Sequence, residues 1–285
     1  MTELRRRMDE DMIIRGMADK TREAYLWAVT GLSKFYRRSP DQVSDEEVQA
    51  YLLHLIRDRH RAWSTCNIIV QGLRFLYHTT LKRDRTTFTI PSPRRSGKLP
   101  VVLNRAEISR LLAATHTRKQ YALLATTYGA GLRVGEVTRL QVHDIDSTRL
   151  TLRVEQGKGG KDRYTLLSAR LLETLRAYWR VSHPTDWLFP GKGGKRPMDP
   201  STAQRFYYAA KARAGITKPG GIHGLRHAFA THLLEAGVDI HTIQRLLGHG
   251  HISTTMRYFH LAQPTLTAHR SPFDLLDSWP ELPPT

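Results

Sequence analysis

The chain is poor in cysteine and lacks a long apolar segment. Cys66 is the single cysteine among 285 residues, which excludes an internal disulfide framework and any metal site built from several cysteines. Because no apolar run approaches the roughly 18 residues of a membrane span, we expect no transmembrane helix. The first residues are basic and then acidic, with no apolar stretch behind them, so no secretory signal is predicted. These absences indicate a cytoplasmic protein that has no membrane partner.

Acidic residues are scarce relative to basic ones. The chain has 44 Lys and Arg against 26 Asp and Glu, which gives a formal net charge of +18. The basic excess occurs in residues 1–100 and again in residues 101–285, so it is not the property of one tail. This distribution favours a long polyanion that contacts both parts, and double-stranded DNA is the commonest one. On charge alone, RNA, ribosomes and acidic lipid are alternatives.

Three helical patterns occur in residues 1–88. The first covers residues 19–38, where apolar side chains recur at helical spacing. The second follows Ser44, a good N-cap residue, with acidic residues in its first turn. The third begins near Ser64. We therefore expect a compact all-α domain over residues 1–88.

Residues 89–100 predict a linker. Prolines resist helix formation in themselves and in the residue before them, so this segment is expected to be extended. It also carries three basic residues, Arg94, Arg95 and Lys98. An extended cationic segment suits contact with phosphates, and we predict that these three side chains bind DNA. A plain spacer is the alternative.

The remainder of the chain combines helices with a short sheet. Asn104 is expected to cap a helix that has Glu107 at its third position. In residues 150–168 the apolar residues alternate with a period of two around a glycine-rich turn, which predicts a β-hairpin. Helical patterns then follow at residues 169–181, 200–214, 225–236 and 240–247.

Three motifs place chemically active side chains close to helix ends. Arg133 follows a glycine turn, His223 and Arg226 open a later helix, and His249 precedes Tyr258 by nine residues. Arginines at helix N-termini can bind phosphate, and histidine carries protons near neutral pH. A tyrosine beside such cations can act as a nucleophile because they stabilise its phenolate. Each residue alone has an ordinary structural explanation, but their joint occurrence favours chemistry on a phosphodiester.

The motifs together resemble the signature of tyrosine recombinases, the phage-integrase and Xer-type family. The resemblance extends from about Lys20 to Tyr258 and rests on Gly131-Leu132-Arg133 with Glu136, His223-x-Leu225-Arg226, Leu247-Gly248-His249 and Tyr258. It implies a mainly α protein with a small β-sheet and two domains. Residues 1–88 would form a helical, SAM-like core-binding domain and residues 101–270 an α+β catalytic domain, which together close on DNA as a C-shaped clamp.

The resemblance also implies an activity, namely site-specific strand cleavage and rejoining through a 3′-phosphotyrosine, without a cofactor, metal ion or ATP. The biological result of this reaction would be DNA integration, excision or dimer resolution, as expected of an Xer-like or mobile-element recombinase. The resemblance also implies roles for seven side chains. Arg133 and Arg226 would hold the scissile phosphate, and His223 and His249 would transfer protons and bind phosphate. Tyr258 would attack phosphorus, Lys158 would protonate the leaving 5′-oxygen, and Glu136 would support the arginine helix.

The choice of lysine depends on a sequence that occurs twice. Gly-Lys-Gly-Gly-Lys contains Lys158 and Lys161 at its first occurrence and Lys192 and Lys195 at its second. The first copy lies between alternating strands and takes the family position, so Lys158 is preferred. Lys161 and the second copy are the alternatives, and Lys161 and Arg163 are predicted to bind DNA. Neither copy has the Gly-Lys-Ser/Thr ending of a nucleotide-binding P-loop.

Other functions fit less of the sequence. A type IB topoisomerase shares this chemistry, but the helical N-terminal domain and the helical end of the chain favour a recombinase. A catalytically silent DNA-binding protein would not need every position of the motif. A metal-dependent nuclease or transposase needs a carboxylate cluster, and the sequence has no acidic pair in a comparable motif. The histidines around His249 lack the H-E-x-x-H pattern and a cysteine pair, so no zinc site is predicted.

The expected partners are double-stranded DNA, with inverted half-sites, and further copies of this chain. Residues 271–285 begin with Ser-Pro and place Phe273, Leu276 and Trp279 on one face of a short helix. This tail could pack on its own domain. The family resemblance instead favours docking on a neighbouring protomer, in a tetramer that holds two duplexes.

Overall fold

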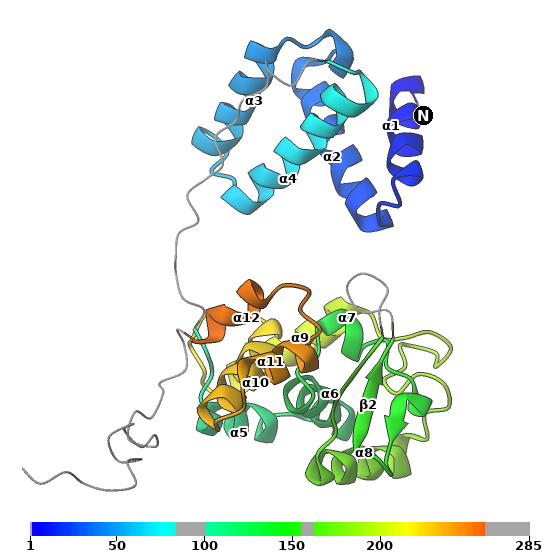
Figure 1. Cartoon of the computed structure of the whole chain (residues 1–285), viewed down its shortest axis with the longest axis vertical. Coiled ribbons are helices and arrows are strands. Elements are labelled where there is room, and N and C mark those ends of the chain that lie inside the picture. Colours follow the sequence, from blue (N-terminus) through cyan, green and yellow to red (C-terminus); the bar gives the residue numbers. More distant parts are fainter. Residues whose placement is uncertain (1, 84–100, 156–161, 260–285) are drawn as a thin grey trace, which may run out of the picture. The chain divides into compact units, whose positions relative to one another are not determined.

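The computed structural model describes residues 2–83, 101–155 and 162–259. The chain separates into two compact units, Met1–Gly97 and Lys98–Thr285, which Figure 1 shows in sequence colours. The boundary between them falls within the predicted linker. Linker residues Arg94, Arg95 and Lys98 and the predicted tail helix lie outside the described residues, so these predictions and the clamp shape stay untested.

The N-terminal unit is built from helices. They are α1 (Glu3–Ile14), α2 (Asp19–Tyr36), α3 (Asp45–Arg57) and α4 (Trp63–Arg74), with a 3-10 turn at Pro40–Gln42 and a π-helical turn at Phe75–Thr80. Helices α2, α3 and α4 confirm the three sequence patterns, and Ser44 forms a capping box with Glu47. Helix α1 was not predicted, because its buried residues, Met8 and Met12, stand among many charges. Cys66 is buried in this core.

The C-terminal unit, Lys98–Thr285, contains the predicted catalytic domain and is called the catalytic unit below. It is mainly α with a small sheet, as predicted. Its helices are α5 (Arg105–Ala113), α6 (Arg118–Gly129), α7 (Val134–Val137), α8 (Ala169–Ser182), α9 (Pro200–Arg213), α10 (His223–Glu235), α11 (Ile240–Leu247) and α12 (Ile252–Phe259). Asn104 and Glu107 form the expected capping box at the start of α5. In the part of the chain that is described, no helix has the length and apolar character needed to cross a membrane.

The sheet contains the predicted hairpin and one further strand. Its order is β1 (Ile145–Asp146), β2 (Thr151–Val154), β3 (Arg163–Leu166), and both pairings are antiparallel. Val154 lies opposite Arg163 at the last described pair of the hairpin. Lys158 and Lys161 lie between these strands in sequence but outside the described residues, so their roles stay predictions.

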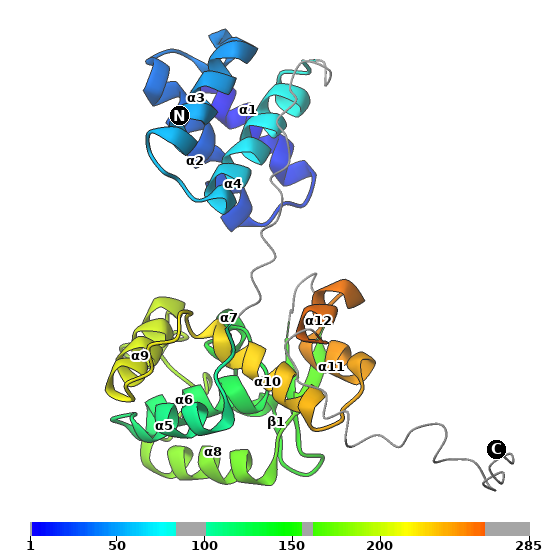
Figure 2. The ribbon, with the colours of Figure 1, turned by 90° about the vertical axis from the view of Figure 1, so that its left-hand side faces the viewer.

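Helix α6 is the centre of the catalytic unit. It packs against α5, α7, α8, α9 and α10, and its residues Ala122, Leu123 and Leu124 are fully buried. Helix α10 in turn contacts α11 and α12, which Figure 2 shows side by side in orange. Helix α10 therefore joins the main core to the C-terminal helices, and it carries the His223–Arg226 motif to that junction.

Candidate active site

The turn before Arg133 requires glycine and brings two motifs together. Gly131 has a φ of +64°, and a Cβ at this position would lie 2.4 Å from Cδ1 of Phe229 on α10. This close approach lets the Gly131 carbonyl accept a hydrogen bond of 2.8 Å from Nη1 of Arg226. Arg133 follows as the N-cap of α7. The glycine therefore allows the two arginine motifs to meet.

The second glycine turn ends α11. Gly248 has a φ of +63°, and a Cβ here would lie 2.7 Å from Cδ of Arg163. The carbonyls just before it are then directed at arginines: Leu247 accepts from Nη2 of Arg226 at 2.6 Å, and Leu246 accepts from Nε of Arg163 at 3.0 Å. These bonds satisfy carbonyls that the end of a helix leaves without an intrahelical partner.

One carboxylate binds three arginines at the centre of the site. Glu136 accepts from Arg133 at 2.7 Å, from both terminal nitrogens of Arg163 at 2.9 and 2.7 Å, and from Arg226 at 3.5 Å. Its side chain is 10% exposed. Burial alone would raise the pKa of Glu136, but the hydrogen bonds and charge of Arg163, with those of the other arginines, lower it to about 2. Glu136 is therefore an anion at neutral pH and orients all three guanidinium groups.

Arg226 is buried and fixes the protonation of its neighbour. Its side chain is 1% exposed, and burial together with the charge of Arg133 lowers its pKa to about 10, so it remains a cation at neutral pH. Nη2 of Arg226 lies 3.1 Å from Nε2 of His249. Because arginine can only donate, His249 Nε2 accepts this bond. The proton of neutral His249 then resides on Nδ1, which lies 2.9 Å from Oγ1 of Thr255.

The tyrosine of the motif is buried against the same cluster. Tyr258 lies on α12 with 4% exposure, and its ring stacks on His249 at a centroid distance of 6.3 Å and an interplanar angle of 11°. Its hydroxyl lies 3.1 Å from Nδ1 of His227. The chain therefore brings its own tyrosine to its own arginine cluster.

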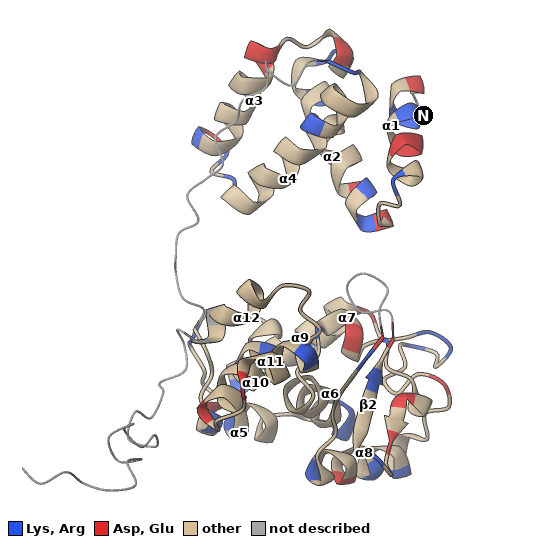
Figure 3. Cartoon of the chain, viewed as in Figure 1, with Lys and Arg blue, Asp and Glu red and all other residues tan. Residues whose placement is uncertain are grey.

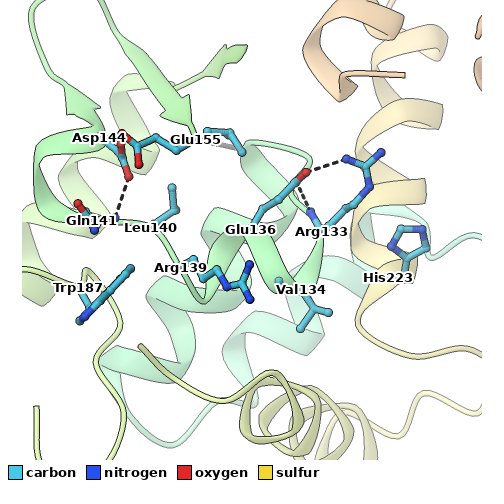
Figure 4. A pocket seen from close by; sticks show the side chains of 12 residues that line it. Arg133, Val134, Glu136, Arg139, Leu140, Gln141, Asp144, Glu155, Trp187 and His223 are labelled. Carbon is cyan, nitrogen blue, oxygen red and sulfur yellow. Dashed lines mark hydrogen bonds and ion pairs between the residues drawn. The ribbon is translucent and has the colours of Figure 1, made fainter. Parts of the chain in front are cut away.

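His223 lies at the edge of a cleft beside Arg133. Figure 4 shows both side chains lining this cleft, which has a volume of about 650 Å³ and extends past Arg139 toward Trp187. Burial, and then the charges of Arg226 and Arg133, lower the pKa of His223. Its imidazole is therefore neutral at pH 7 and can donate one hydrogen bond while it accepts another.

The structure brings together five of the predicted catalytic residues, namely Arg133, His223, Arg226, His249 and Tyr258, with Glu136 among them. Their catalytic roles stay predictions. The predicted DNA-binding residue Arg163 has different partners: its side chain is 9% exposed, and its guanidinium nitrogens bind Glu136 and the Leu246 carbonyl. These bonds allow Arg163 to hold the arginine cluster, and its predicted contact with DNA stays a prediction.

Sequence reasoning missed His227 as a site residue. It follows His223 by four residues on α10, and side chains at this spacing share one face of a helix. Their rings are 4.6 Å apart between centroids. The pairing His-x-x-x-His at the start of a helix was therefore the available signal, but the partner, Tyr258, lies 31 residues away in sequence.

A group with metal-ligand chemistry lies on the far side of the cleft. Ligand atoms of His143, Asp144 and Glu155 lie within 4.8 Å of one another. Arg153 pairs with the carboxylates of both Asp144 and Glu155. The arginine thus supplies the positive charge that these acids need, and the prediction that the chain uses no metal stays a prediction.

Comparisons with known proteins identify the family of the chain. The profile of the phage integrase family matches residues 101–264, and that of the phage integrase N-terminal SAM-like domain matches residues 4–87. A proposed integrase/recombinase of Sinorhizobium fredii, y4qK, is 41% identical over 285 residues, which cover 100% of this chain and 92% of the relative. Tyrosine recombinase XerD of Rhizobium meliloti is 30% identical over 275 residues and 88% of each chain.

A solved structure shares the fold. The site-specific recombinase XerH, crystallised on palindromic difH substrate as a post-cleavage complex, is 20% identical with a TM-score of 0.71, over 89% of this chain and 80% of its own. The motif residues, the SAM-like and catalytic domains and these likenesses lead to one conclusion. The chain belongs to the phage integrase family of tyrosine recombinases.

Proposed function

We propose that this chain recombines DNA at specific sites by cutting and rejoining strands through a 3′-phosphotyrosine at Tyr258. One observation carries the proposal: Tyr258 stacks on His249, His249 accepts from Arg226, and Arg226 shares Glu136 with Arg133. A nucleophilic hydroxyl is thereby linked to two phosphate-binding cations through direct contacts.

The proposed reaction needs charge stabilisation at the phosphate. Attack by the Tyr258 oxygen produces a pentacoordinate phosphorane with additional negative charge, which guanidinium groups held in advance can stabilise without reorganising. Glu136 and the carbonyls of Gly131 and Leu247 hold Arg226 in this way. Arg133 is 28% exposed, so part of its guanidinium is accessible to a phosphate that enters the cleft.

The proposed intermediate explains why no ATP would be consumed. The P–O bond to the 5′-oxygen breaks as the bond to Tyr258 forms, with Lys158 as the predicted donor of a proton to that oxygen. Because the phosphotyrosine is itself a phosphodiester, a 5′-hydroxyl can attack it and reverse the reaction at nearly equal energy. Rejoining to a different strand is then recombination.

We further propose that the partner is double-stranded DNA with inverted half-sites, bound by four copies of the chain. The basic excess in both units supports the first part, as does the DNA-bound structure of XerH. The tetramer rests on the predicted docking of residues 271–285. Deleting these residues should reduce cooperative DNA binding and recombination while leaving the binding of one copy intact.

Covalent capture tests the proposal. The substrate is a pool of duplexes randomised around a central nick, because the short strand beyond the nick diffuses away after cleavage and the adduct remains. We expect wild-type protein to form a denaturation-resistant DNA adduct, whose sequences define the site, and Tyr258→Phe to form none. An adduct that persists in Tyr258→Phe would contradict the assignment of the nucleophile.

A further inference from the structure

We propose that His227 accepts the proton of Tyr258 when the tyrosine oxygen attacks phosphorus. This inference rests on the proposed function, since it concerns the same nucleophile. It adds a residue for which the family motif implied no role, and it gives the histidines of the site different tasks.

The geometry places His227 on the reacting atom. Its Nδ1 lies 3.1 Å from the Tyr258 hydroxyl oxygen, within the range for a proton acceptor. The two rings are 5.6 Å apart between centroids and inclined by 51°. The imidazole therefore approaches the hydroxyl with a ring nitrogen and does not stack flat on the phenol. His227 also makes an edge-to-face contact with His223.

The other histidines have positions that suit other tasks. His249 accepts from Arg226 through Nε2, and its Nδ1 contacts Thr255, so taking a proton would require it to release Arg226. His223 lines the cleft beside Arg133, where a neutral imidazole can donate to a phosphate oxygen. His227 contacts the tyrosine hydroxyl through a ring nitrogen, and Arg226 keeps its bond to His249 in this arrangement.

The proposed step is balanced in both directions. In cleavage the Tyr258 oxygen forms a bond to phosphorus, its proton moves to Nδ1 of neutral His227, and the bond from phosphorus to the 5′-oxygen breaks, with Lys158 as the predicted proton donor to that oxygen. In rejoining the 5′-hydroxyl attacks, its proton returns to Lys158, and His227 gives its proton back to the tyrosine oxygen. No oxidant, reductant or further reactant is consumed.

Substitutions at position 227 separate proton transfer from positioning. Asn places an amide near the location of Nδ1, so it can hold the tyrosine hydroxyl but cannot take a proton from it. We expect His227→Ala to lower the single-turnover rate of adduct formation by about 100-fold or more, the usual contribution of a general base. His227→Asn should remain close to His227→Ala. A rate restored nearly to wild type by Asn would overturn proton acceptance in favour of positioning.

The same helix offers a matched control. His232 on α10 contacts the hydroxyl of Tyr128 through Nδ1 at 2.9 Å, the same type of pair away from the arginine cluster. His232→Asn should keep the wild-type adduct rate. All variants are first compared for binding to the captured DNA site, which shows that the catalytic unit is folded.

A more acidic tyrosine provides an independent measurement. Difluorotyrosine at position 258 ionises more readily, so its attack depends less on a proton acceptor. The ratio of wild-type to His227→Ala rates should therefore become smaller with difluorotyrosine than with tyrosine. An unchanged ratio, or a His227→Ala rate within about threefold of wild type where 100-fold is expected, would overturn the inference. Failure of the wild-type protein to form any Tyr258-dependent adduct would instead overturn the proposed function.

Discussion

The two units of the chain use their charged side chains differently. In the N-terminal unit, Arg6 pairs with Glu3 on α1, and these side chains are 54% and 68% exposed; Figure 3 shows both signs of charge along this helix. In the catalytic unit, Arg226 is 1% exposed, and its partner Glu136 is 10% exposed. The Arg6–Glu3 pair is therefore exposed to water, as is the Arg176–Glu173 pair on α8, whereas the Glu136 cluster is buried.

The difference supports the proposed location of the chemistry at the Glu136 cluster. Exposed ion pairs contribute little to stability because water and salt screen them. Buried ions lose hydration worth several kcal/mol each, which their partners must offset. The Glu136 cluster carries three arginines for one acid, so it holds an excess of buried positive charge. Such an arrangement is poorly explained by stability and well explained by a phosphate that completes it.

The largest effect is expected from the buried arginine. Arg226→Ala removes a guanidinium from the transition state, so the rate of adduct formation should fall by about 10²–10³-fold or more. Binding of the captured DNA site should be largely kept, because many other basic residues contribute to it. Arg176→Ala on α8, which removes the exposed partner of Glu173, is the control and should change neither quantity. Equal losses of binding and cleavage in Arg226→Ala would assign the residue to affinity.

The stabilisation that ionised Glu136 gains from its arginines should depend on pH. Because the folded pKa of Glu136 is about 2, below its ordinary 4.5, its stabilisation is fully present above about pH 4.5 and is lost as pH falls toward 2. Its size is about 3 kcal/mol. Glu136→Gln should therefore lower the free energy of unfolding at pH 7, with the difference from wild type narrowing below pH 4.5. Urea unfolding of both proteins across pH measures this, and a constant difference would contradict it.

Arg163 distinguishes a supporting residue from a DNA contact. In Arg163→Met, adduct formation should slow by about tenfold, since Glu136 loses its bidentate partner. The dependence of DNA affinity on salt should stay unchanged. A phosphate contact would instead reduce the slope of log affinity against log salt by about one. Arg94→Met in the linker, still predicted to bind DNA, is the comparison that should reduce the slope.

The smallest effect is expected in the N-terminal unit. Arg6→Ala removes the exposed pairs with Glu3 and Glu10, and we expect no measurable change in melting temperature or adduct formation. Thermal unfolding in low and high salt checks this result. A clear loss of stability would remove the contrast between exposed and buried pairs.

Sequence patterns predicted the local structure well, since caps and periodicity are local properties. Ser44, Asn104 and the hairpin strands behave as their neighbours in sequence dictate. Contacts across the fold were less accessible. The bonds of Arg163 to Glu136, 27 residues earlier, could not be predicted from a strand residue next to a basic turn. Its contact with DNA stays a prediction.

His227 was missed for a related reason. Its partner hydroxyl lies on α12, and helix α11 separates the two residues in sequence. The motif residues could be recognised because they match the family signature. A side chain that contacts one of them, such as His227, is found only from the distance between the two in the folded chain. Burial of Arg226 was likewise unpredictable from composition, since arginine is usually exposed.

Peptide mapping of the trapped adduct tests the central claim most directly. The wild-type protein is captured on the nicked site, digested with protease and nuclease, and analysed by mass spectrometry. The account predicts that the peptide containing Tyr258 carries a nucleotide through its 3′-phosphate on the tyrosine oxygen, and that this mass is absent from Tyr258→Phe. A nucleotide attached to any other residue, or DNA cleaved by wild type with no covalent peptide, would contradict it.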